Sequence, residues 1–446
     1  MSFTRTLRAV GGAVVAGALL FGTAPVASAD QIRKGQWPLT VFGADDIWKV
    51  STGKGVTVAV IDQPVDGKHP DLKGNVLPGK NFAGGGTADH ADGKQEHGTA
   101  MASLIAGHGH GAGGSEGVKG LAPDAKILPL GMDFEGSADS AEFGKGSMSY
   151  AAPLRYAVDH GATIVNMSFD TANTEPSSAE QAAVEYARKH DVLLVASSGN
   201  AGVETPRNPA AAPGVLAVGA VDVDLKVWKY SNYGPHIKLL APGVHIRSAG
   251  VEDPYRLANG TSDAAAYVSA AAALLRARFP DLTSGQIANR LVKSAVVPDD
   301  KKEAKLPDPH YGYGTIRPYS ALTKDIPPGS KNGPLPALGG GSSSGSSKDP
   351  EQGAKADGDK GMSTGALVGI FAGGAVVLAI VLGVVIVAVR KKNRRNDPPS
   401  GGPGGYGGPG GSGGFVPHPP NPNPYQQQPS PPGSYPPAPP TRLSGQ

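Results

Sequence analysis

The first strand that the sequence predicts reads Val56-Thr57-Val58-Ala59-Val60-Ile61-Asp62, an apolar and largely β-branched run that ends in a carboxylate. Strands without polar residues at alternate positions are typical of a sheet that is buried on both faces. Four further runs of similar length and composition follow along the chain, at residues 127–130, 163–167, 192–196 and 215–221. Together these runs predict a central parallel sheet.

Helical segments separate these strands. Residues 151–160 and 178–190 have helical length and spacing, and residues 261–279 form an Ala- and Leu-rich stretch that predicts the longest helix. Strands that alternate with helices predict an α/β fold in which helices cover both faces of the sheet. In such folds, functional residues lie at the carboxyl ends of strands and at helix N-termini.

Three polar residues lie at these positions. Asp62 ends the first strand, His97 begins a helix of small residues, and Ser262 lies in the first turn of the longest helix. Taken singly, each has a structural explanation, because an Asp after a strand often caps a turn and a Ser before a helix is often its N-cap. Taken together, they supply a hydroxyl nucleophile, a base that takes its proton and a carboxylate that orients the base.

Asn200 is a fourth polar residue at the same edge. It follows the strand at residues 192–196, in the segment Ser198-Gly199-Asn200. Its amide could donate to the oxyanion that forms when a hydroxyl attacks a carbonyl, a contact worth about 2.7–4 kcal/mol of transition-state stabilisation. The alternative is an ordinary turn residue. The segment alone favours neither.

The order of these four residues resembles that of the subtilisin-like serine proteases. The resemblance extends from about Gln36 to Lys324 and includes the segments Val60-Ile61-Asp62, His69-Pro70-Asp71-Leu72, His97-Gly98-Thr99, Ile164-Val165-Asn166-Met167-Ser168, Ser198-Gly199-Asn200, Val218-Gly219-Ala220-Val221, Ala241-Pro242-Gly243 and Gly260-Thr261-Ser262. It implies a three-layer subtilisin-like α/β fold with a mainly parallel central sheet. It further implies a triad of Asp62, His97 and Ser262, with Asn200 in the oxyanion hole.

The same resemblance implies a protein or peptide substrate, with Ser168, Phe169 and Asp170 among the residues that bind it. Asp170 stands where a Gly commonly lines the primary specificity pocket of the family. An acidic side chain at this position predicts a narrower pocket, or one that prefers a basic residue.

Two further departures from the family pattern lie beside the predicted triad. Gln63 and Pro64 replace the Thr or Ser and the Gly that usually follow the catalytic Asp, and Asp263 replaces the Met or Phe that usually follows the nucleophile. An acid near the oxyanion could make its formation more costly. Two hypotheses therefore follow from the sequence: an active endopeptidase, or a catalytically impaired scaffold that stabilises a membrane secretion complex.

Both ends of the chain carry membrane-targeting features. Residues 1–29 combine basic residues, an apolar run and Ala27-Ser28-Ala29, as a cleaved signal peptide does. Residues 365–389 are 25 residues without a charge, enough to cross a bilayer as a helix. The basic cluster at residues 390–395 follows, which predicts that the catalytic domain is extracytoplasmic and the tail cytoplasmic.

These features divide the chain into five parts. They are a signal peptide at 1–29, a peptidase domain at 30–325, a flexible Pro-, Gly- and Ser-rich stalk at 326–364, a transmembrane helix at 365–389, and a basic cluster with a disordered Pro/Gly-rich tail at 390–446. This layout is similar to that of the membrane-anchored mycosins of type VII secretion. The similarity implies a single-pass protein of the cell membrane with a type VII secretion complex as a partner.

Composition excludes several other functions. The net charge is +3, but Arg5, Arg8 and the basic cluster at 390–395 more than account for it, so the rest of the chain is acidic and nucleic-acid binding is not expected. The chain has no cysteine, which excludes disulfides and a Cys nucleophile. No cofactor is expected. The loop 89–96 and the segment His108-Gly109-His110 are weak metal-site candidates, and a structural calcium ion of the kind that relatives bind has no site that the sequence identifies.

Overall fold

A seven-stranded parallel sheet forms the centre of the fold in the computed structural model, which describes residues 31–134, 149–171 and 173–335. Across the sheet the strands lie in the order β2 (Lys80–Asn81), β5 (Lys126–Gly131), β1 (Thr57–Asp62), β6 (Ile164–Met167), β7 (Leu193–Ser197), β8 (Val215–Val221) and β9 (Ile237–Pro242). The strand β1 is therefore flanked by β5 and β6. The predicted α/β fold with a parallel sheet is confirmed.

Side chains of β1 alternate between two hydrophobic clusters. Val58 and Val60 join the cluster that contains the long helix α8 (Thr261–Arg278), while Ala59 and Ile61 join the cluster on the other face. Because successive side chains of a strand point to opposite faces, a continuous apolar run is what a sheet covered on both sides requires.

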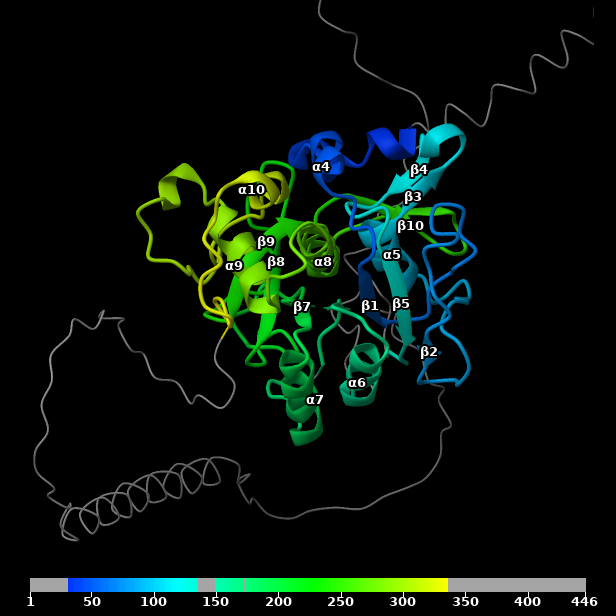
Figure 1. Ribbon diagram of the computed structural model, residues 1–446, viewed down its shortest axis with the longest axis horizontal. Helices are drawn as coiled ribbons and strands as arrows, with labels where there is room; N and C mark the ends of the chain where they lie inside the picture. The colour runs from blue at the N-terminus through cyan, green and yellow to red at the C-terminus, as the bar shows by residue number, and fades with distance from the viewer. Residues whose placement is uncertain (1–30, 135–148, 172, 336–446) are drawn as a thin grey trace, which may run out of the picture. The chain divides into compact units, whose positions relative to one another are not determined.

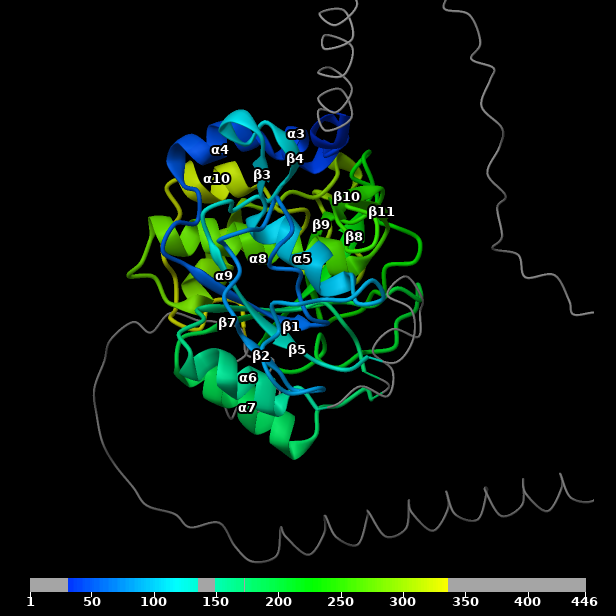
Figure 2. The ribbon, with the colours of Figure 1, turned by 90° about the vertical axis from the view of Figure 1, so that its right-hand side faces the viewer.

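Helices cover both faces. On one side lie α5 (His97–Ala106), α8 and α9 (Ser284–Ser294), and on the other lie α6 (Ala151–Asp159) and α7 (Ser178–Lys189), as Figures 1 and 2 show. The helix α8 is buried along almost its whole length. Its many alanines have small side chains, so the surrounding elements can approach its backbone closely.

Strand prediction was good for the buried centre of the sheet and poor at its margins. All five predicted strands are present, shifted by at most one residue at either end, and the predicted helices are α6, α7, α8 and, beginning at His97, α5. The edge strands β2 and β9 were not predicted. Two antiparallel ribbons were also missed: β3 (His108–His110) with β4 (Glu116–Lys119), and β10 (Ile246–Ala249) with β11 (Tyr255–Ala258).

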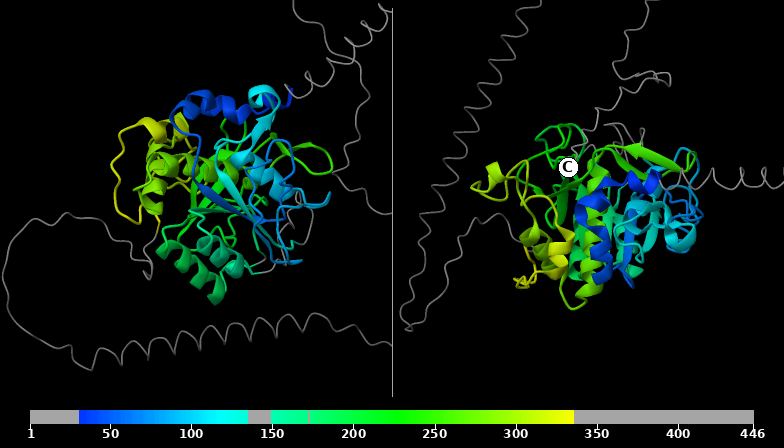
Figure 3. Two further views of the ribbon diagram at one scale, coloured as in Figure 1. Left: turned by 45° about the vertical axis from the view of Figure 1, so that its right-hand side comes forward. Right: turned by 90° about the horizontal axis from the view of Figure 1, so that it is seen from above.

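The N-terminal segment packs onto the domain through two short helices, α3 (Trp37–Phe42) and α4 (Ala44–Val50), which Figure 3 shows at the top of its left-hand view. Before them, the Arg33 guanidinium donates to the carbonyl oxygens of Gly114, Glu116 and Gly117 at 3.0–3.2 Å. These bonds attach the segment to the β3–β4 ribbon.

The C-terminal boundary of the domain differs from the predicted one. A stalk was expected from Ile326 onward, but residues 326–335 pack against α9 after a last short helix, α10 (Pro318–Thr323). Asn289 donates to the carbonyls of Pro327 and Pro328, and Leu335 is buried. The packed part of the chain therefore continues about ten residues beyond the predicted domain end at residue 325, because side chains of α9 bind the backbone of this Pro-rich segment.

In the part of the chain that the structure describes, no helix is both long enough and apolar enough to span a membrane. The predicted signal peptide (1–29), transmembrane helix (365–389), cytoplasmic tail (390–446) and the stalk beyond Leu335 lie outside the described residues.

Candidate active site

Four predicted site residues lie at or just beyond one edge of the sheet. Asp62 is the last residue of β1, Asn200 follows β7 by three residues, and Ser262 is the second residue of α8. His97 is the first residue of α5. Because the parallel strands β1, β6 and β7 are neighbours, their carboxyl ends bring segments that are far apart in sequence together.

Asp62 and His97 form a buried pair. Both carboxylate oxygens of Asp62 lie 2.9 Å from Nδ1 of His97, and the two side chains are 0% and 3% exposed. Since the carboxylate accepts a hydrogen bond from Nδ1–H, it favours the tautomer in which Nε2 carries the lone pair that can act as a base.

Gln63 supports this pair from both sides, although it departs from the family pattern. Its backbone N–H donates to Oδ1 of Asp62 at 2.7 Å, and its side-chain Oε1 accepts the backbone N–H of His97 at 3.1 Å. The first turn of α5 also packs tightly here, because a Cβ on Gly98 would lie 2.0 Å from the Gln63 carbonyl oxygen. Gln63 thus links the end of β1 to the start of α5.

Ser262 and Ser168 hold each other through reciprocal bonds. The Ser262 hydroxyl donates to the Ser168 carbonyl oxygen at 3.0 Å, and the Ser168 hydroxyl donates to the Ser262 carbonyl oxygen at 3.0 Å. Asn166 Nδ2 donates to the same Ser168 hydroxyl at 2.8 Å. The first turn of α8 is therefore fixed to the end of β6 beneath Ser262, the predicted nucleophile.

Thr261 orients Asn200. Oδ1 of Asn200 accepts from the backbone N–H of Thr261 at 2.9 Å and from its hydroxyl at 2.8 Å, while the same hydroxyl accepts from Gly199 N–H at 3.1 Å. Because Thr261 holds the Oδ1 atom, the Nδ2 group of the Asn200 amide points away from Thr261. The backbone N of Ser262 and Nδ2 of Asn200 lie 3.6 and 3.8 Å from the point where a Cβ on Gly260 would stand. Both donors thus border one small space.

The three predicted substrate-binding residues have different surroundings. The hydroxyl of Ser168 is fully buried, and the Phe169 ring packs in the core against Phe134 and Tyr150, with centroids 5.2 and 6.1 Å apart. Neither side chain is available to a ligand, so only their backbones could contact one. Asp170 is partly exposed, and its Oδ2 lies 3.8 Å from Nε of Arg207. The sequence pattern did not identify Arg207.

Asp263, the acid beside Ser262, is only 3% exposed. Its Oδ2 lies 3.2 Å from where a Cβ on Gly260 would stand. Burial, and next the Asp263 carboxylate, raise the pKa of the Tyr267 hydroxyl one helical turn further along α8. The acid therefore faces the interior beside the first turn of α8.

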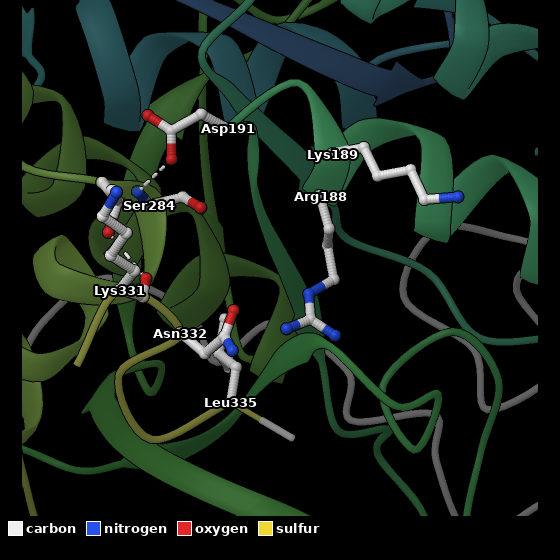
Figure 4. Close-up of a pocket in the computed structure, with 9 residues that line it drawn as sticks. Arg188, Lys189, Asp191, Ser284, Lys331, Asn332 and Leu335 are labelled. Carbon is white, nitrogen blue, oxygen red and sulfur yellow. Dashed lines mark hydrogen bonds between the residues drawn. The ribbon is translucent and has the colours of Figure 1, made fainter. Parts of the chain in front are cut away.

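Among the residues that the structure describes, no group of three or more His, Cys, Asp or Glu side chains could hold a metal ion. The weak candidate His110 instead places its Nδ1 2.6 Å from Oδ1 of Asp71, whose Oδ2 accepts the backbone N–H of Val118. A basic cavity of about 220 Å³, drawn in Figure 4, lies beside the C-terminal end of α7 and the N-terminal end of α9. None of the four site residues lines this cavity.

A parallel sheet with a buried Asp–His pair at its carboxyl edge and a serine in the first turn of a central helix is the layout of a subtilisin-like serine protease. The model of the subtilase family matches residues 53–314, and the chain belongs to this family of serine proteases.

The mycosins are among its relatives. Mycosin-1 of Mycobacterium tuberculosis (strain ATCC 25618 / H37Rv) is 33% identical over 351 residues, which cover 67% of this chain and 75% of that protein. The solved structure of the serine protease MycP1, described as an essential component of the type VII (ESX-1) secretion system, is 29% identical with a TM-score of 0.54, over 65% of this chain and 88% of that chain. The MycP3 protease from the type VII (ESX-3) secretion system is 30% identical with a TM-score of 0.52, over 65% of this chain and 88% of that chain.

Proposed function

We propose that the chain is a membrane-anchored, extracytoplasmic serine endopeptidase that processes secreted proteins or supports a type VII secretion system. Ser262 is its nucleophile, His97 its general base and Asp62 the carboxylate that orients His97. The observation that carries this proposal is the buried Asp62–His97 pair, 2.9 Å apart, at the same sheet edge as the first turn of α8.

The reaction begins when the Ser262 hydroxyl turns from the Ser168 carbonyl toward Nε2 of His97. Hydrogen bonds of this kind are often long or misaligned without substrate and tighten when it binds. His97 takes the hydroxyl proton while Oγ attacks the scissile carbonyl carbon. The resulting imidazolium is stabilised by Asp62, which stays ionised.

The tetrahedral intermediate places negative charge on the former carbonyl oxygen. The backbone N–H of Ser262 and Nδ2 of Asn200 donate to it, and the N-terminus of α8 favours negative charge at the same place. His97 then gives its proton to the leaving amine as the peptide bond breaks, which leaves an acyl-enzyme on Ser262. A water molecule, activated by His97, hydrolyses that ester and restores the hydroxyl.

The membrane topology is part of the proposal. A cleaved signal peptide exports the domain, residues 365–389 span the bilayer, and the basic cluster at 390–395 stays on the cytoplasmic side. The mycosin relatives support the link to type VII secretion. Because the chain has no cysteine, single cysteines can test this topology. Ser343→Cys should react with an impermeant maleimide on intact cells, whereas Ser430→Cys should react only after lysis.

A fluorophosphonate probe tests the catalytic part, because it labels an activated serine without a known substrate. The full-length protein should be labelled, Ser262→Ala should not, and Ser294→Ala should be labelled as the matched control. Ser294 is also a buried helical serine, and its hydroxyl bonds to Leu291 within α9. An unlabelled but folded wild-type protein would contradict the proposal and favour the scaffold, for which the buried Asp263 beside the nucleophile is the supporting observation.

A further inference from the structure

The cavity of about 220 Å³ in Figure 4 has an excess of positive charge. Three cationic side chains line it, those of Arg188, Lys189 and Lys331. The one carboxylate among the described lining residues belongs to Asp191, and both of its oxygens are engaged. Oδ1 accepts the backbone N–H of Ser284 at 2.6 Å, and Oδ2 accepts from the Arg276 guanidinium at 3.0 Å. Asp191 therefore does not compensate the charge of the three lining cations.

The Arg188 guanidinium has no counter-ion in this cavity. It makes no hydrogen bond or ion pair with any residue that the structure describes. Its aliphatic stem passes over Gly214, which has no side chain to obstruct it. Burial lowers the pKa of this guanidinium, and the charge of Glu185, three residues earlier, counteracts the shift only in part. Arg188 is thus partly removed from water without an anion that replaces the water, and a bound anion would relieve this cost.

Ser284 supplies an unpaired hydroxyl to the same cavity. It is the first residue of α9, lines the cavity and is only 8% exposed. Its hydroxyl has no hydrogen-bond partner in the described part of the chain. In Figure 4 this hydroxyl points from the start of α9 toward the side of the cavity where Arg188 lies. Because a buried hydroxyl normally has a partner, its position here indicates that a ligand completes the site.

Lys331 lies across the cavity from Arg188, as Figure 4 shows. Its backbone is fixed against the first turn of α9, because the Thr283 hydroxyl donates to the Lys331 carbonyl at 2.7 Å. The contact is close, since a Cβ on Gly285 would collide with the same carbonyl oxygen. Lys331 is therefore held at the rim of the cavity although its side chain is exposed.

We propose that this cavity binds a phosphate group, with Arg188 and Lys331 as its cations and Ser284 as a neutral donor. A guanidinium matches the oxygens of a phosphate with two parallel donors, and a lysine adds a point charge. The N-terminus of α9 favours negative charge at the same place. This inference goes beyond the proposed function, because no residue of the catalytic machinery lines the cavity.

The phosphate could belong to a lipid headgroup or to a soluble phosphate ester. Leu335, the last residue that the structure describes, lines the cavity, and the proposed membrane span begins at residue 365. The intervening residues 336–364 reach at most about 100 Å when fully extended. The connection is therefore long enough for the cavity to meet the surface of the same bilayer.

Titration calorimetry on the full-length protein in a neutral detergent tests the inference. One arm adds inorganic phosphate, and the other adds phosphatidylglycerol to the micelles. Arg188→Gln and Lys331→Gln should each weaken the binding about tenfold, because each removes a charged partner of the phosphate. Ser284→Ala should weaken it about fivefold, the loss of one neutral hydrogen bond. Lys293→Gln, the same change of charge at the other end of α9, is the matched control and should bind as the wild type does.

The two arms distinguish the source of the phosphate. Phosphatidylglycerol binding that Arg188→Gln weakens would identify a lipid headgroup, whereas binding of inorganic phosphate alone would identify a soluble ester. No binding in either arm would overturn the inference. Equal weakening by Lys293→Gln would overturn it as well, because the binding would then depend on overall charge. Circular dichroism spectra establish that each variant is folded.

Labelling by the fluorophosphonate probe keeps this inference separate from the proposed function. The three cavity variants should be labelled as the wild type is, since the cavity does not include Ser262. An unlabelled wild-type protein that binds phosphate would overturn the proposed function and leave this inference standing. A labelled wild-type protein that binds no phosphate would do the reverse.

Discussion

The side chain of Ser168 has a structural role that is separate from the substrate binding predicted for this residue. The family resemblance assigns it to substrate binding, but its hydroxyl is buried and joins Asn166 to the Ser262 carbonyl. Ser168→Ala should therefore lower the unfolding free energy by about 1–3 kcal/mol, because it leaves the buried Asn166 amide without its acceptor. KM should stay unchanged. Urea denaturation and steady-state kinetics on the same preparation measure both quantities.

The control for this change is Ser294→Ala, whose hydroxyl donates only to the Leu291 carbonyl within its own helix. It should cost less than 1 kcal/mol, since the carbonyl oxygen it leaves has a second lone pair and remains in the helix. A raised KM at unchanged stability in Ser168→Ala would instead mean that the Ser168 hydroxyl itself acts in substrate binding.

His236 gives the fold a defined pH response. Burial, and next the charge of Lys238, lower its pKa below 6.5, and neither ring nitrogen has a hydrogen-bond partner among the described residues. The unfolded chain therefore binds the proton at a higher pH than the folded chain does. Stability should be complete above about pH 6.5 and should fall as the pH drops from there toward the folded-state pKa.

Replacing this histidine isolates its contribution. In His236→Gln, which does not titrate, the unfolding free energy measured by urea between pH 7.5 and 5 should fall less steeply than in the wild type. Equal slopes in the two proteins would mean that His236 is not the group responsible.

Individual residues of the site were predictable when a motif carried them. Asp62, His97, Asn200 and Ser262 all belong to segments with a local pattern. Arg207 was missed because its role depends on a contact with Asp170, 37 positions earlier, and no local pattern marks such a pair. The hydrogen bond from His97 N–H to the Gln63 side chain was missed for the same reason.

At the level of elements, the start of α5 positions His97, the predicted base. A Cβ on Gly98 would lie 2.0 Å from the Gln63 carbonyl oxygen, a backbone atom that cannot move aside cheaply. Gly98→Ala should therefore push the first turn of α5 away from β1 and separate His97 from Asp62. Because small displacements of catalytic groups are costly, kcat should fall about 100-fold, measured by turnover of a peptide substrate.

Gly93→Ala provides the control for this substitution. A Cβ on Gly93 would meet its nearest neighbour, Cβ of Glu252, at 3.5 Å, which is an ordinary contact. It should retain wild-type kcat. If Gly98→Ala did the same, the tight approach of α5 to β1 would not be what positions His97.

The elements that composition predicted are those whose burial is continuous. Strands β1, β6, β7 and β8 are covered on both faces, so most of their residues are apolar. The missed strand β2 has only two residues and lies at an edge, where a short strand carries no periodicity to read. The ribbons β3–β4 and β10–β11 depend on partners across a turn, and their single strands are three or four residues long.

At the scale of the whole molecule, the domain ends in a segment whose composition resembles that of a linker. Residues 326–335 are rich in Pro and Gly, which indicates a flexible stalk by composition. Contacts with side chains of α9 give these residues their ordered conformation. Arg290 donates to carbonyls of Ala321, Lys324 and Ile326, and Asn289 to those of the two prolines that follow. Since every residue has a carbonyl, the sequence of the segment itself gives no sign of these bonds.

These contacts predict that the domain needs residues beyond Asp325, the predicted domain end, for its full stability. A chain that stops after Asp325 loses the Ile326 acceptor of Arg290 and the buried side chains of Ile326 and Leu335, whereas a chain that stops after Leu335 keeps them. Burying two aliphatic side chains contributes about 3–6 kcal/mol, which the ordering of ten backbone residues offsets in part. The shorter chain should therefore unfold at a temperature about 5 °C lower, measured by circular dichroism. Equal unfolding temperatures would mean that residues 326–335 contact α9 without adding to the stability of the domain. Residue 325 would then be the end of the stabilised domain, as the sequence predicts.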